Sequence, residues 1–403
     1  MSASPRPGER LTDVQTATFD ALRSAAGAAL LAQATAAHGR EDEFALGTRL
    51  RRDHEPDLVA AALTQARLRA RAADKFDPAD AERMFFTVDG YEQATRVAVA
   101  RHRASRLAAT LGAGAAVADL CCGIGGDLVE LARAGLTVTG VEADELTAAV
   151  AAANVAALEV DARVVHGDAT TVDRAAYAAV VCDPARRGGR GRVFDPDAYR
   201  PPWSFVLSLL AETACVKVAP GLPHERIPAG VEAEWVSERG EVKEAALWSG
   251  GLARDGVERR ATLLPSGATL TDRDDPGPSV RPLGGYLYEP DGAVIRAGLV
   301  TAAAALVGGG LLDPSIAYVT ADAAVGTPFA RGYRVVDTLP YDVKALRRYV
   351  RAQDIGVLTV KKRGVGVEPE RLRAAVRPRG ERAATFVVTR IAGAATVIVA
   401  DPL

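Results

Sequence analysis

The segment Val117-Ala-Asp-Leu-Cys-Cys-Gly-Ile-Gly-Gly-Asp127 decides the fold that we expect for this chain. An apolar run leads into a glycine-rich turn, and the stretch Asp127–Arg133 that follows has a helical composition. Glycines let a backbone approach a ligand without a Cβ in the way, and a helix N-terminus exposes unpaired N–H groups. The segment therefore predicts a strand–turn–helix unit that holds a nucleotide.

Further apolar runs follow this segment and alternate with helical stretches such as Glu145–Leu158. The expected strands are Val117–Leu120, Thr137–Glu142, Arg163–His166, Ala178–Cys182 and Cys215–Ala219. Strands that alternate with helices indicate a parallel sheet covered on both faces. Ala233–Ser237 and Glu241–Trp248 are separated by a short stretch with a glycine and predict an antiparallel hairpin at the end of the sheet. The fold class is therefore α/β, with a Rossmann-like sheet.

Three acids lie at the ends of successive strands. Asp119 opens the glycine-rich turn where the dinucleotide-binding fingerprint begins with a glycine. An anion there disfavours pyrophosphate and favours a ligand with a sulfonium and an ammonium group, namely S-adenosylmethionine. Glu142 is placed to bind both ribose hydroxyls, and Asp168 to accept from the adenine amino group. The alternative interpretation is that Asp119 caps a helix and that Glu142 and Asp168 are solubilising acids at strand ends. It explains each residue separately, but not why the three occur in this order. The candidate cofactor-binding residues are Asp119, Cys121, Gly123, Gly125, Asp127, Glu142 and Asp168.

The fourth strand continues into Asp183-Pro-Ala-Arg186, beside the place where the methyl group would lie in this fold. This string resembles the Asp/Asn-Pro-Pro-aromatic motif of methyltransferases that act on exocyclic base nitrogens. In that motif a side-chain oxygen and a backbone carbonyl accept hydrogen bonds from the amino group, so that most of the rate comes from positioning. Asp183, Pro184 and Arg186 are the candidate catalytic residues.

Two positions depart from that motif. Ala185 replaces the second proline, and Arg186 stands where an aromatic ring would stack on a flipped base. The rings that would have to replace it are Phe85, Phe86, Phe194 and Trp203. The string also resembles uracil-C5 methyltransferases of RNA, which need a nucleophilic cysteine after the next strand. This chain has Lys217-Val-Ala-Pro-Gly221 there, so uracil-C5 chemistry is disfavoured.

Basic residues gather at two places that suit phosphate contacts. Four arginines between residues 186 and 192 are interleaved with glycines, and each offers a fork of donors. Residues 331–403 carry 12 Arg and 3 Lys against 7 acids, or +8, whereas the rest of the chain has 34 basic and 44 acidic residues, or −10. A solvated charged surface is the alternative explanation. The candidate RNA-binding residues are Arg187, Arg190, Lys361, Lys362 and Arg363.

Composition limits the class of protein. The 403 residues carry a net charge of −2, with 48% hydrophobic and 25% charged residues, values typical of a globular protein. No apolar run reaches the roughly 18 residues of a membrane span, and the charged N-terminus argues against a secretory signal. Four cysteines and five scattered histidines predict neither a disulfide scaffold nor a metal site. We expect a cytoplasmic protein.

The stretch Asp272–Pro282, rich in proline, glycine and charge, marks the best domain boundary. We expect an N-terminal helical segment (1–74), a methyltransferase domain (75–270), a linker and connecting segment (271–325) and a small basic α+β domain (326–403). Long helical stretches are expected at Val14–Ala37, Asp57–Ala73 and Val294–Leu306.

With these motifs in hand, the chain resembles a bacterial family of class I S-adenosylmethionine-dependent methyltransferases that carry a C-terminal THUMP-like domain. The resemblance covers most of the chain and rests on Lys75-Phe76, Phe85-Phe-Thr87, Gln93-Ala-Thr95, Asp119–Asp127, Asp183–Arg187, Lys217–Gly221, Tyr286–Pro290 and Lys361–Gly364. The core is also similar to trimethylguanosine synthases, which methylate the guanine N2 of RNA caps. True THUMP domains bind RNA and usually precede the catalytic domain, whereas this one follows it. The resemblance therefore implies the cofactor directly and RNA binding by analogy.

The leading hypothesis is an S-adenosylmethionine-dependent methyltransferase that modifies an exocyclic base nitrogen of structured RNA, tRNA or rRNA. A second hypothesis is a small-molecule methyltransferase whose C-terminal module is a lid or a dimerisation element. A third is a non-catalytic RNA-binding protein that retains the fold. An NAD-dependent oxidoreductase is disfavoured by Asp119.

Overall fold

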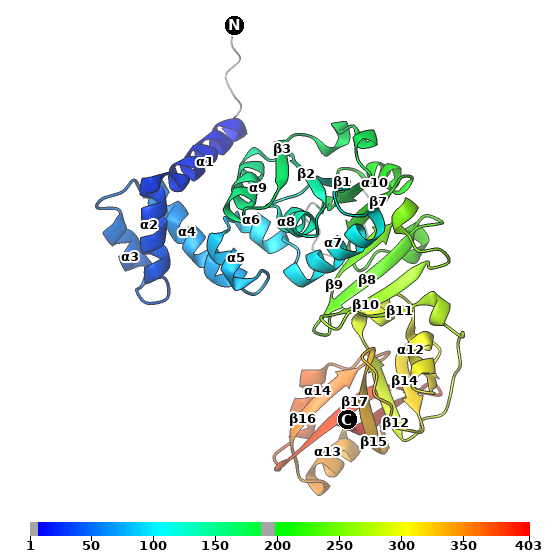
Figure 1. Cartoon of the computed structure of the whole chain (residues 1–403). Helices are drawn as coiled ribbons and strands as arrows, with labels where there is room; N and C mark the ends of the chain where they lie inside the picture. The colour runs from blue at the N-terminus through cyan, green and yellow to red at the C-terminus, as the bar shows by residue number, and fades with distance from the viewer. Residues whose placement is uncertain (1–6, 187–197) are drawn as a thin grey trace. The chain divides into compact units, whose positions relative to one another are not determined.

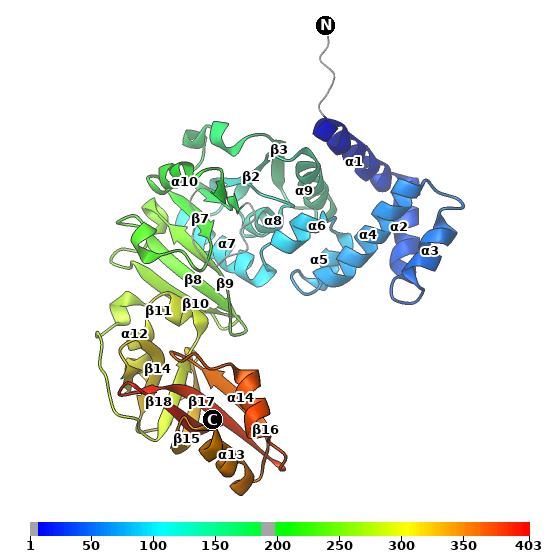
Figure 2. The same cartoon turned by 180° about the vertical axis from the view of Figure 1, so that it is seen from behind.

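A computed structural model of the chain describes residues 7–186 and 198–403. The chain forms two compact units, one made of Met1–Val218 with Leu247–Leu252 and the other of Ala219–Ala246 with Ala253–Leu403. Figure 1 and Figure 2 show the chain from two opposite sides. None of the described helices is both long and apolar enough to cross a membrane.

The first unit begins with helices. They are α1 (Pro7–Arg23), α2 (Ala25–Ala37), α3 (Glu43–Leu50), α4 (Pro56–Ala72), α5 (Pro78–Arg83), α6 (Val88–Gln93) and α7 (Val97–Leu111). The stretch Val14–Ala37, expected as one helical run, belongs to two helices. The reason is that the Ser24 side chain accepts a hydrogen bond from the backbone N–H of Gly27 and caps the start of α2. Pro56 and Pro78 stand at the first positions of α4 and α5, where a helix needs no N–H.

Five parallel strands form the sheet of the first unit. They are β1 (Ala116–Leu120), β2 (Thr137–Glu142), β3 (Ala162–His166), β4 (Ala179–Cys182) and β7 (Ala214–Val218), in the order β7-β4-β1-β2-β3. The helices between them are α8 (Gly126–Arg133), α9 (Glu145–Ala157) and α10 (Trp203–Leu210). Both views show α1 beside α9 (Figures 1 and 2). Each strand lies within one residue of its expected range. The chain order reverses between β1 and β4, and such sheets bind ligands at the carboxyl ends of their strands there.

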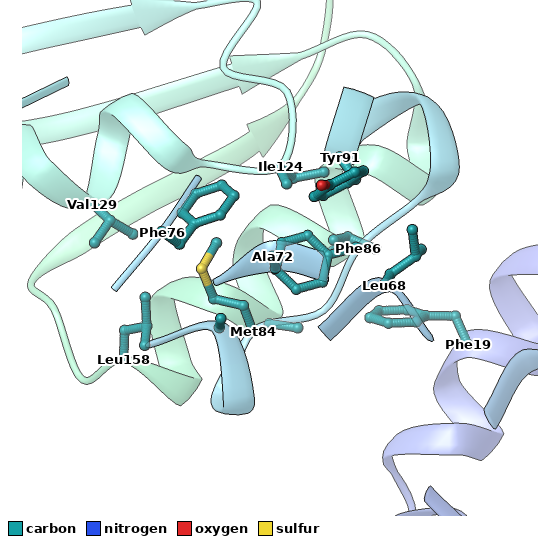
Figure 3. Close-up of a cluster of buried hydrophobic side chains, with 13 residues drawn as sticks. Phe19, Leu68, Ala72, Phe76, Met84, Phe86, Tyr91, Ile124, Val129 and Leu158 are labelled. Atoms are coloured by element: carbon teal, nitrogen blue, oxygen red, sulfur yellow. The ribbon is translucent and has the colours of Figure 1, made fainter. Parts of the chain in front are cut away.

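A cluster of buried hydrophobic side chains joins the early helices to the sheet layer (Figure 3). Phe76, Phe86 and Tyr91 pack in one cluster with Ile124, which lies in the glycine-rich turn after β1. The rings of Phe86 and Tyr91 meet edge to face, with their centroids 6.2 Å apart. Full burial of such a side chain contributes about 1.5–3 kcal/mol. The segment that contains Phe76, Phe86 and Tyr91 therefore packs against Ile124 and holds the glycine-rich turn in place.

A short ribbon follows β4. It pairs β5 (Ala185–Arg186) with β6 (Tyr199–Arg200), and the short 3₁₀ turns Ala169–Thr171 and Arg174–Ala176 precede β4. The ribbon flanks residues 187–197, which lie outside the described part of the chain. The assignments of Arg187, Arg190 and Phe194 fall on these residues.

The expected hairpin lies in the second unit except for its last two residues, Leu247 and Trp248. β8 (Glu232–Glu238) and β9 (Glu241–Trp248) are neighbours, and the turn between them holds Arg239 and Gly240 at φ 53° and 84°. Two strands beyond this hairpin had no sequence prediction, because they mix apolar with charged or small polar residues. β10 (Arg259–Leu264) runs parallel to β8, and β11 (Ala268–Thr271) runs antiparallel to β10.

A seven-stranded sheet makes up the rest of the second unit. Its strands are β12 (Tyr286–Pro290), β13 (Gly310–Asp313), β14 (Ile316–Ala321), β15 (Ala330–Pro340), β16 (Ile355–Lys362), β17 (Arg382–Ile391) and β18 (Ala394–Pro402), in the order β13-β14-β12-β15-β18-β17-β16. Its helices are α11 (Gly292–Arg296), α12 (Val300–Leu306), α13 (Val343–Ala352) and α14 (Pro369–Val376). The helix expected over Val294–Leu306 is interrupted at Gly298, which has φ 69°. Residues 286–321, expected as part of a connecting segment, supply three strands of this sheet.

We expect Phe86→Ala to lower the free energy of unfolding by about 3–5 kcal/mol, because the ring is 1% exposed and its removal leaves a cavity. Phe44→Ala is the control, since Phe44 is 80% exposed and should change that free energy by less than about 0.5 kcal/mol. Urea unfolding followed by tryptophan fluorescence measures both. Equal effects of the two substitutions would contradict the place of Phe86 in the core.

Candidate functional site

The turn between β1 and α8 is built on left-handed backbone. Cys121, Gly123 and Gly125 have φ angles of 61°, 55° and 86°. This region favours glycine, so Cys121 adopts it at a cost in backbone energy. A Cβ added to Gly123 would meet no atom within 4 Å, which shows open space beside the turn. At Gly123 the turn therefore borders open space, whereas at Gly125 it lies close to Ala151 of α9.

Asp119 lies in β1, immediately before this turn. Asp119 is 2% exposed, and its Oδ2 has no hydrogen-bond partner in the described part of the chain. A buried carboxylate oxygen without a partner is costly in a folded protein. This oxygen is therefore available to a ligand that reaches the end of β1.

Glu142 ends β2, and Asp168 follows β3. Glu142 accepts from the N–H of Gly123 through Oε2 and from the N–H of Asp144 through Oε1, both at 3.0 Å. Asp168 accepts from the N–H and the hydroxyl of Thr170, both at 2.8 Å. These hydrogen bonds lower the pKa of Asp168, so it is ionised at neutral pH. The parallel pairing of β1, β2 and β3 brings the three acids of the sequence analysis to the same edge of the sheet.

Asp127, in the first turn of α8, uses both carboxylate oxygens within the protein. Oδ1 forms an ion pair with Arg103 of α7, a residue that is 2% exposed, and Oδ2 accepts from the hydroxyl of Thr95 at 2.6 Å. Burial opposes ionisation of Asp127, but the charges of Arg103 and Lys217 and these hydrogen bonds outweigh it and lower its pKa. Asp127 thus anchors the segment before the sheet to α8.

Lys217 connects this anchor to the acceptor motif. Its Nζ donates to Asp183 Oδ2 at 2.5 Å and to the hydroxyl of Thr95 at 2.7 Å. The N–H of Asp183 donates to the carbonyl oxygen of Leu120 at 3.2 Å, at the end of β1. The Lys217 side chain is 15% exposed and that of Asp183 is 39% exposed. A chain of polar contacts therefore runs from Asp183 through Lys217 and Thr95 to Asp127.

Sequence reasoning did not assign Lys217, Thr95 or Arg103 to the site. A signal existed for Lys217, because a lysine inside the apolar strand Ala214–Val218 needs a partner when it is partly buried. Thr95 and Arg103 gave no such signal. They precede the sheet in the chain, and only tertiary packing brings them to it.

The remaining acceptor-site residues lie as follows. Pro184 is buried, and Arg186 is the second residue of β5. Among the proposed stacking rings, Phe86 is wrong, because it is 1% exposed inside the core. Phe85 is partly buried and Trp203 is 8% exposed.

The basic run near the C-terminus is paired within the second unit. Lys361 Nζ donates to Glu289 Oε2 at 2.5 Å, and Arg363 lies 4.0 Å from the other oxygen of Glu289. Lys362 donates to Glu368 at 3.2 Å. Any phosphate contact by these three residues would compete with existing ion pairs.

The cysteines are free thiols, and three of the four are buried. Burial raises the pKa of Cys122 well above its usual range, and the charges of Asp119 and Glu142 add to this effect. The Cys122 thiol is therefore neutral and buried. Within residues 7–186 and 198–403, no three His, Cys, Asp or Glu side chains are grouped to hold a metal ion.

Two proteins of Mycobacterium tuberculosis match most of the chain. One comes from strain CDC 1551 / Oshkosh and one from strain H37Rv, and each is named an uncharacterized S-adenosylmethionine-dependent methyltransferase. Each is 38% identical over 346 residues, which cover 84% of this chain and 94% of the relative. This chain belongs to the S-adenosylmethionine-dependent methyltransferases.

Parts of this methyltransferase match separate families. Residues 117–185 match a methyltransferase domain, residues 330–402 match the THUMP domain-like family, and residues 15–72 match a domain of unknown function. Among solved structures, a Porphyromonas gingivalis W83 protein assigned as a methyltransferase aligns with a TM-score of 0.72 and 22% identity, over 86% of this chain and 91% of that one. This likeness concerns the fold, and it supports the class I architecture expected from the sequence.

The methyltransferase uses S-adenosylmethionine, and the surroundings of Asp119 test whether this site fits that cofactor. Burial raises the pKa of Asp119 well above its usual range, and the charges of Asp127 and Asp183 raise it further, against the opposing charges of Arg103 and Lys217. Three carboxylates thus share two cations. The raised pKa favours the neutral form of Asp119 in the empty site, and a ligand that carries a sulfonium and an ammonium group would favour its charged form. The residues present therefore fit the methyl donor.

In the cofactor-free protein, we expect Asp119→Asn to raise the melting temperature at neutral pH. A carboxyl group whose pKa is higher in the folded chain than in the unfolded chain stabilises the fold at low pH, and this contribution is lost as the pH rises through the folded pKa. Wild-type stability should therefore fall as the pH rises from about 4, the unfolded pKa, towards neutrality, and the variant should lack this fall. Calorimetry should show S-adenosylmethionine binding weakened about 10- to 100-fold in the variant.

Asp127→Asn is the matched control, because the pKa of Asp127 is lowered and its charge pairs with a buried arginine. We expect it to destabilise the fold by about 3–5 kcal/mol at neutral pH. Scanning fluorimetry between about pH 5 and pH 8 compares the two variants. If Asp119→Asn destabilised the protein as much as Asp127→Asn, Asp119 would be a structural residue and not a ligand site.

Proposed function

We propose that this methyltransferase modifies an exocyclic base nitrogen of structured RNA, tRNA or rRNA, in the cytoplasm. The observation that carries the proposal is the acceptor motif Asp183-Pro184 at the carboxyl end of β4, beside the point where the strand order reverses, with Lys217 fixed on one oxygen of Asp183. The THUMP-like match over residues 330–402 and the charge of +8 in residues 331–403 support an RNA substrate.

We assign the donor site to the edge formed by β1, β2 and β3. Asp119 faces the cationic part of the donor, Glu142 binds the ribose hydroxyls, and Asp168 accepts from the adenine amino group. Cys121, Gly123, Gly125 and Asp127 shape the turn that carries them. The bound donor supplies a methyl group on an electrophilic sulfonium. Glu142 already accepts two backbone N–H groups, which hold its carboxylate in a fixed orientation for a diol.

Asp183 and Pro184 position the acceptor. Lys217 holds Oδ2 of Asp183, and Oδ1 has no hydrogen bond to any residue of the described chain, so Oδ1 is the oxygen that accepts from the substrate amino group. The carbonyl oxygen of Pro184 accepts the second hydrogen bond and leaves the nitrogen lone pair facing the methyl carbon. Rate then comes from alignment, and the nitrogen loses its proton after transfer. Arg186 is assigned to this site by its place directly after the motif.

The alternatives differ in what they would modify. A small-molecule methyltransferase with a C-terminal lid would turn over metabolites and show no salt-sensitive affinity for RNA. A non-catalytic RNA-binding protein would leave every methylated nucleoside unchanged. The lysine that fixes Asp183 favours an enzyme over the non-catalytic alternative, because a protein without catalysis has no need to hold an acceptor residue in place.

Mass spectrometry of nucleosides from total RNA tests the proposal. A strain that lacks the gene should miss one methylated nucleoside, and the wild-type gene should restore it while Asp183→Ala does not. Loss of Asp183 removes the oxygen that aligns the amino group, so we expect at least about a 100-fold lower rate. An unchanged nucleoside profile in the deletion strain would contradict an RNA base as substrate.

Substitutions of Lys217 test whether this residue positions Asp183 or binds the methyl donor. With RNA from the deletion strain and radiolabelled S-adenosylmethionine, we expect Lys217→Met to lower kcat about 10- to 100-fold, because Asp183 loses the contact that fixes it. Donor affinity should change much less, and Lys217→Arg should recover part of the rate. If Lys217→Met lowered donor affinity and left kcat unchanged, Lys217 would belong to the donor site.

A further inference from the structure

The second unit contains a cleft of about 1110 Å³ that the proposed methyl transfer does not use. Its walls come from the β8–β9 turn, the β10–β11 turn, the end of β12 with the start of α11, the stretch 325–332 and the end of β16. Small-ligand pockets measure about 300–1000 Å³. The cleft is therefore at the upper end of the size range of small-ligand pockets.

Cations outnumber carboxylates in its lining. The charged lining residues are Arg239, Arg331, Lys361, Arg363, Glu289 and Asp291. Both carboxylates are committed within the protein. Glu289 accepts from Lys361 at 2.5 Å, and Asp291 accepts from the N–H of Ala293 at 2.8 Å and from the hydroxyl of Ser237 at 3.0 Å. The cleft is thus left with an excess of positive charge.

Arg239 and Arg331 supply this excess from two separate elements, the β8–β9 turn and β15. Both are exposed, and neither has an ion pair or a side-chain hydrogen bond with another residue of the described chain. Lys361 and Arg363, in contrast, already share Glu289. The guanidinium groups of Arg239 and Arg331 are therefore the donors in this cleft that a ligand can engage without breaking an existing pair. Each offers the planar fork that matches phosphate oxygens.

The uncharged residues that line the cleft indicate which part of an RNA strand would fit in it. Apart from polar and charged residues, the described lining is made of aliphatic side chains, prolines and glycines, including Leu264, Pro265, Ile295 and Leu403. No aromatic ring is among these lining residues. Proteins that hold single strands by their bases use aromatic rings for stacking. A cleft with arginines and no rings suits a sugar–phosphate backbone better than unstacked bases.

We infer that this cleft binds the phosphate backbone of the RNA substrate through Arg239 and Arg331, with Lys361 and Arg363 as a paired cationic wall. The inference rests on the proposed function, since it takes RNA as the substrate. It also moves the phosphate contacts of the second unit away from the Lys361-Lys362-Arg363 run. All three residues of that run are engaged by Glu289 or Glu368.

Salt-dependent binding of a labelled RNA tests the inference on the full chain. The probe is a fluorescein-labelled single-stranded RNA of about 12 nucleotides, within the range of known single-strand site sizes. Fluorescence anisotropy gives the slope of log K against log salt. Removal of two phosphate contacts in the double variant Arg239→Gln/Arg331→Gln should make that slope shallower by about 1.4, since each contact contributes about 0.7 for a single strand. Affinity at low salt should fall about 10- to 100-fold.

Arg348→Gln/Arg371→Gln is the matched control. Both arginines are exposed, lie on α13 and α14 of the same unit, and line no part of the cleft. The control variant loses the same net charge as the cleft variant. If its salt slope changes by less than about 0.3, the location of the arginines in the cleft, and not the loss of charge, causes the change in slope. Since all four side chains are exposed, equal melting temperatures of both variants and the wild type check the fold.

The outcomes separate the inference from the proposed function. If the wild-type protein binds RNA and the control variant weakens binding as much as the cleft variant, the cleft assignment is wrong and the RNA substrate stands. If the wild-type protein binds neither this probe nor structured RNA from the deletion strain at any salt concentration, both fail, whereas binding of the structured RNA alone would overturn only the cleft assignment. Competition with inorganic phosphate completes the test. Displacement of the RNA by inorganic phosphate at an equal concentration of phosphate groups would assign a free-anion site and overturn the strand assignment.

Discussion

The buried carboxylate of Asp119 is the constraint on which the rest of the site depends. Parallel pairing of β1 between β2 and β4 fixes it at the strand end, where it is 2% exposed and close enough to Asp127 and Asp183 for their charges to raise its pKa. A fold selected for stability alone would not gather three carboxylates around two cations. The arrangement makes sense when a cationic methyl donor completes it.

The polar contacts around this carboxylate give the early helices a role beyond packing. Thr95 precedes α7 and Arg103 lies in it, and together they hold both oxygens of Asp127. Lys217 then bridges Thr95 and Asp183. The cluster that contains Phe86 fixes the same segment against the turn (Figure 3). The segment before the sheet is therefore part of the site, because without it Lys217 and Asp127 would lose partners.

The second unit holds the cleft to which we assign RNA binding. Its seven-stranded sheet includes the strands β12–β14 as well as the THUMP-like residues 330–402, so the matched family covers only part of one sheet. The ion pairs of Lys361, Lys362 and Arg363 show that a basic run in a sequence is not automatically a free basic surface. Pairing decides which cations remain for a ligand, and we assign that role to Arg239 and Arg331.

The sequence by itself determined the parallel strands of the first unit, the glycine-rich turn, and the order of Asp119, Glu142 and Asp168 at the strand ends. These features are local, since an apolar run, a glycine turn and a helix start can each be recognised within about ten residues. The strands β10 and β11 were not predicted, because they mix apolar with charged or small polar residues. The break at Gly298 was not predicted either, because a single glycine can also lie inside a helix. Only the tertiary structure decided that Lys217 binds Asp183, that Phe86 is buried in the core, and that Glu289 forms an ion pair with Lys361. These facts depend on contacts between residues far apart in the chain, and no local pattern records which distant side chain will fill a given position.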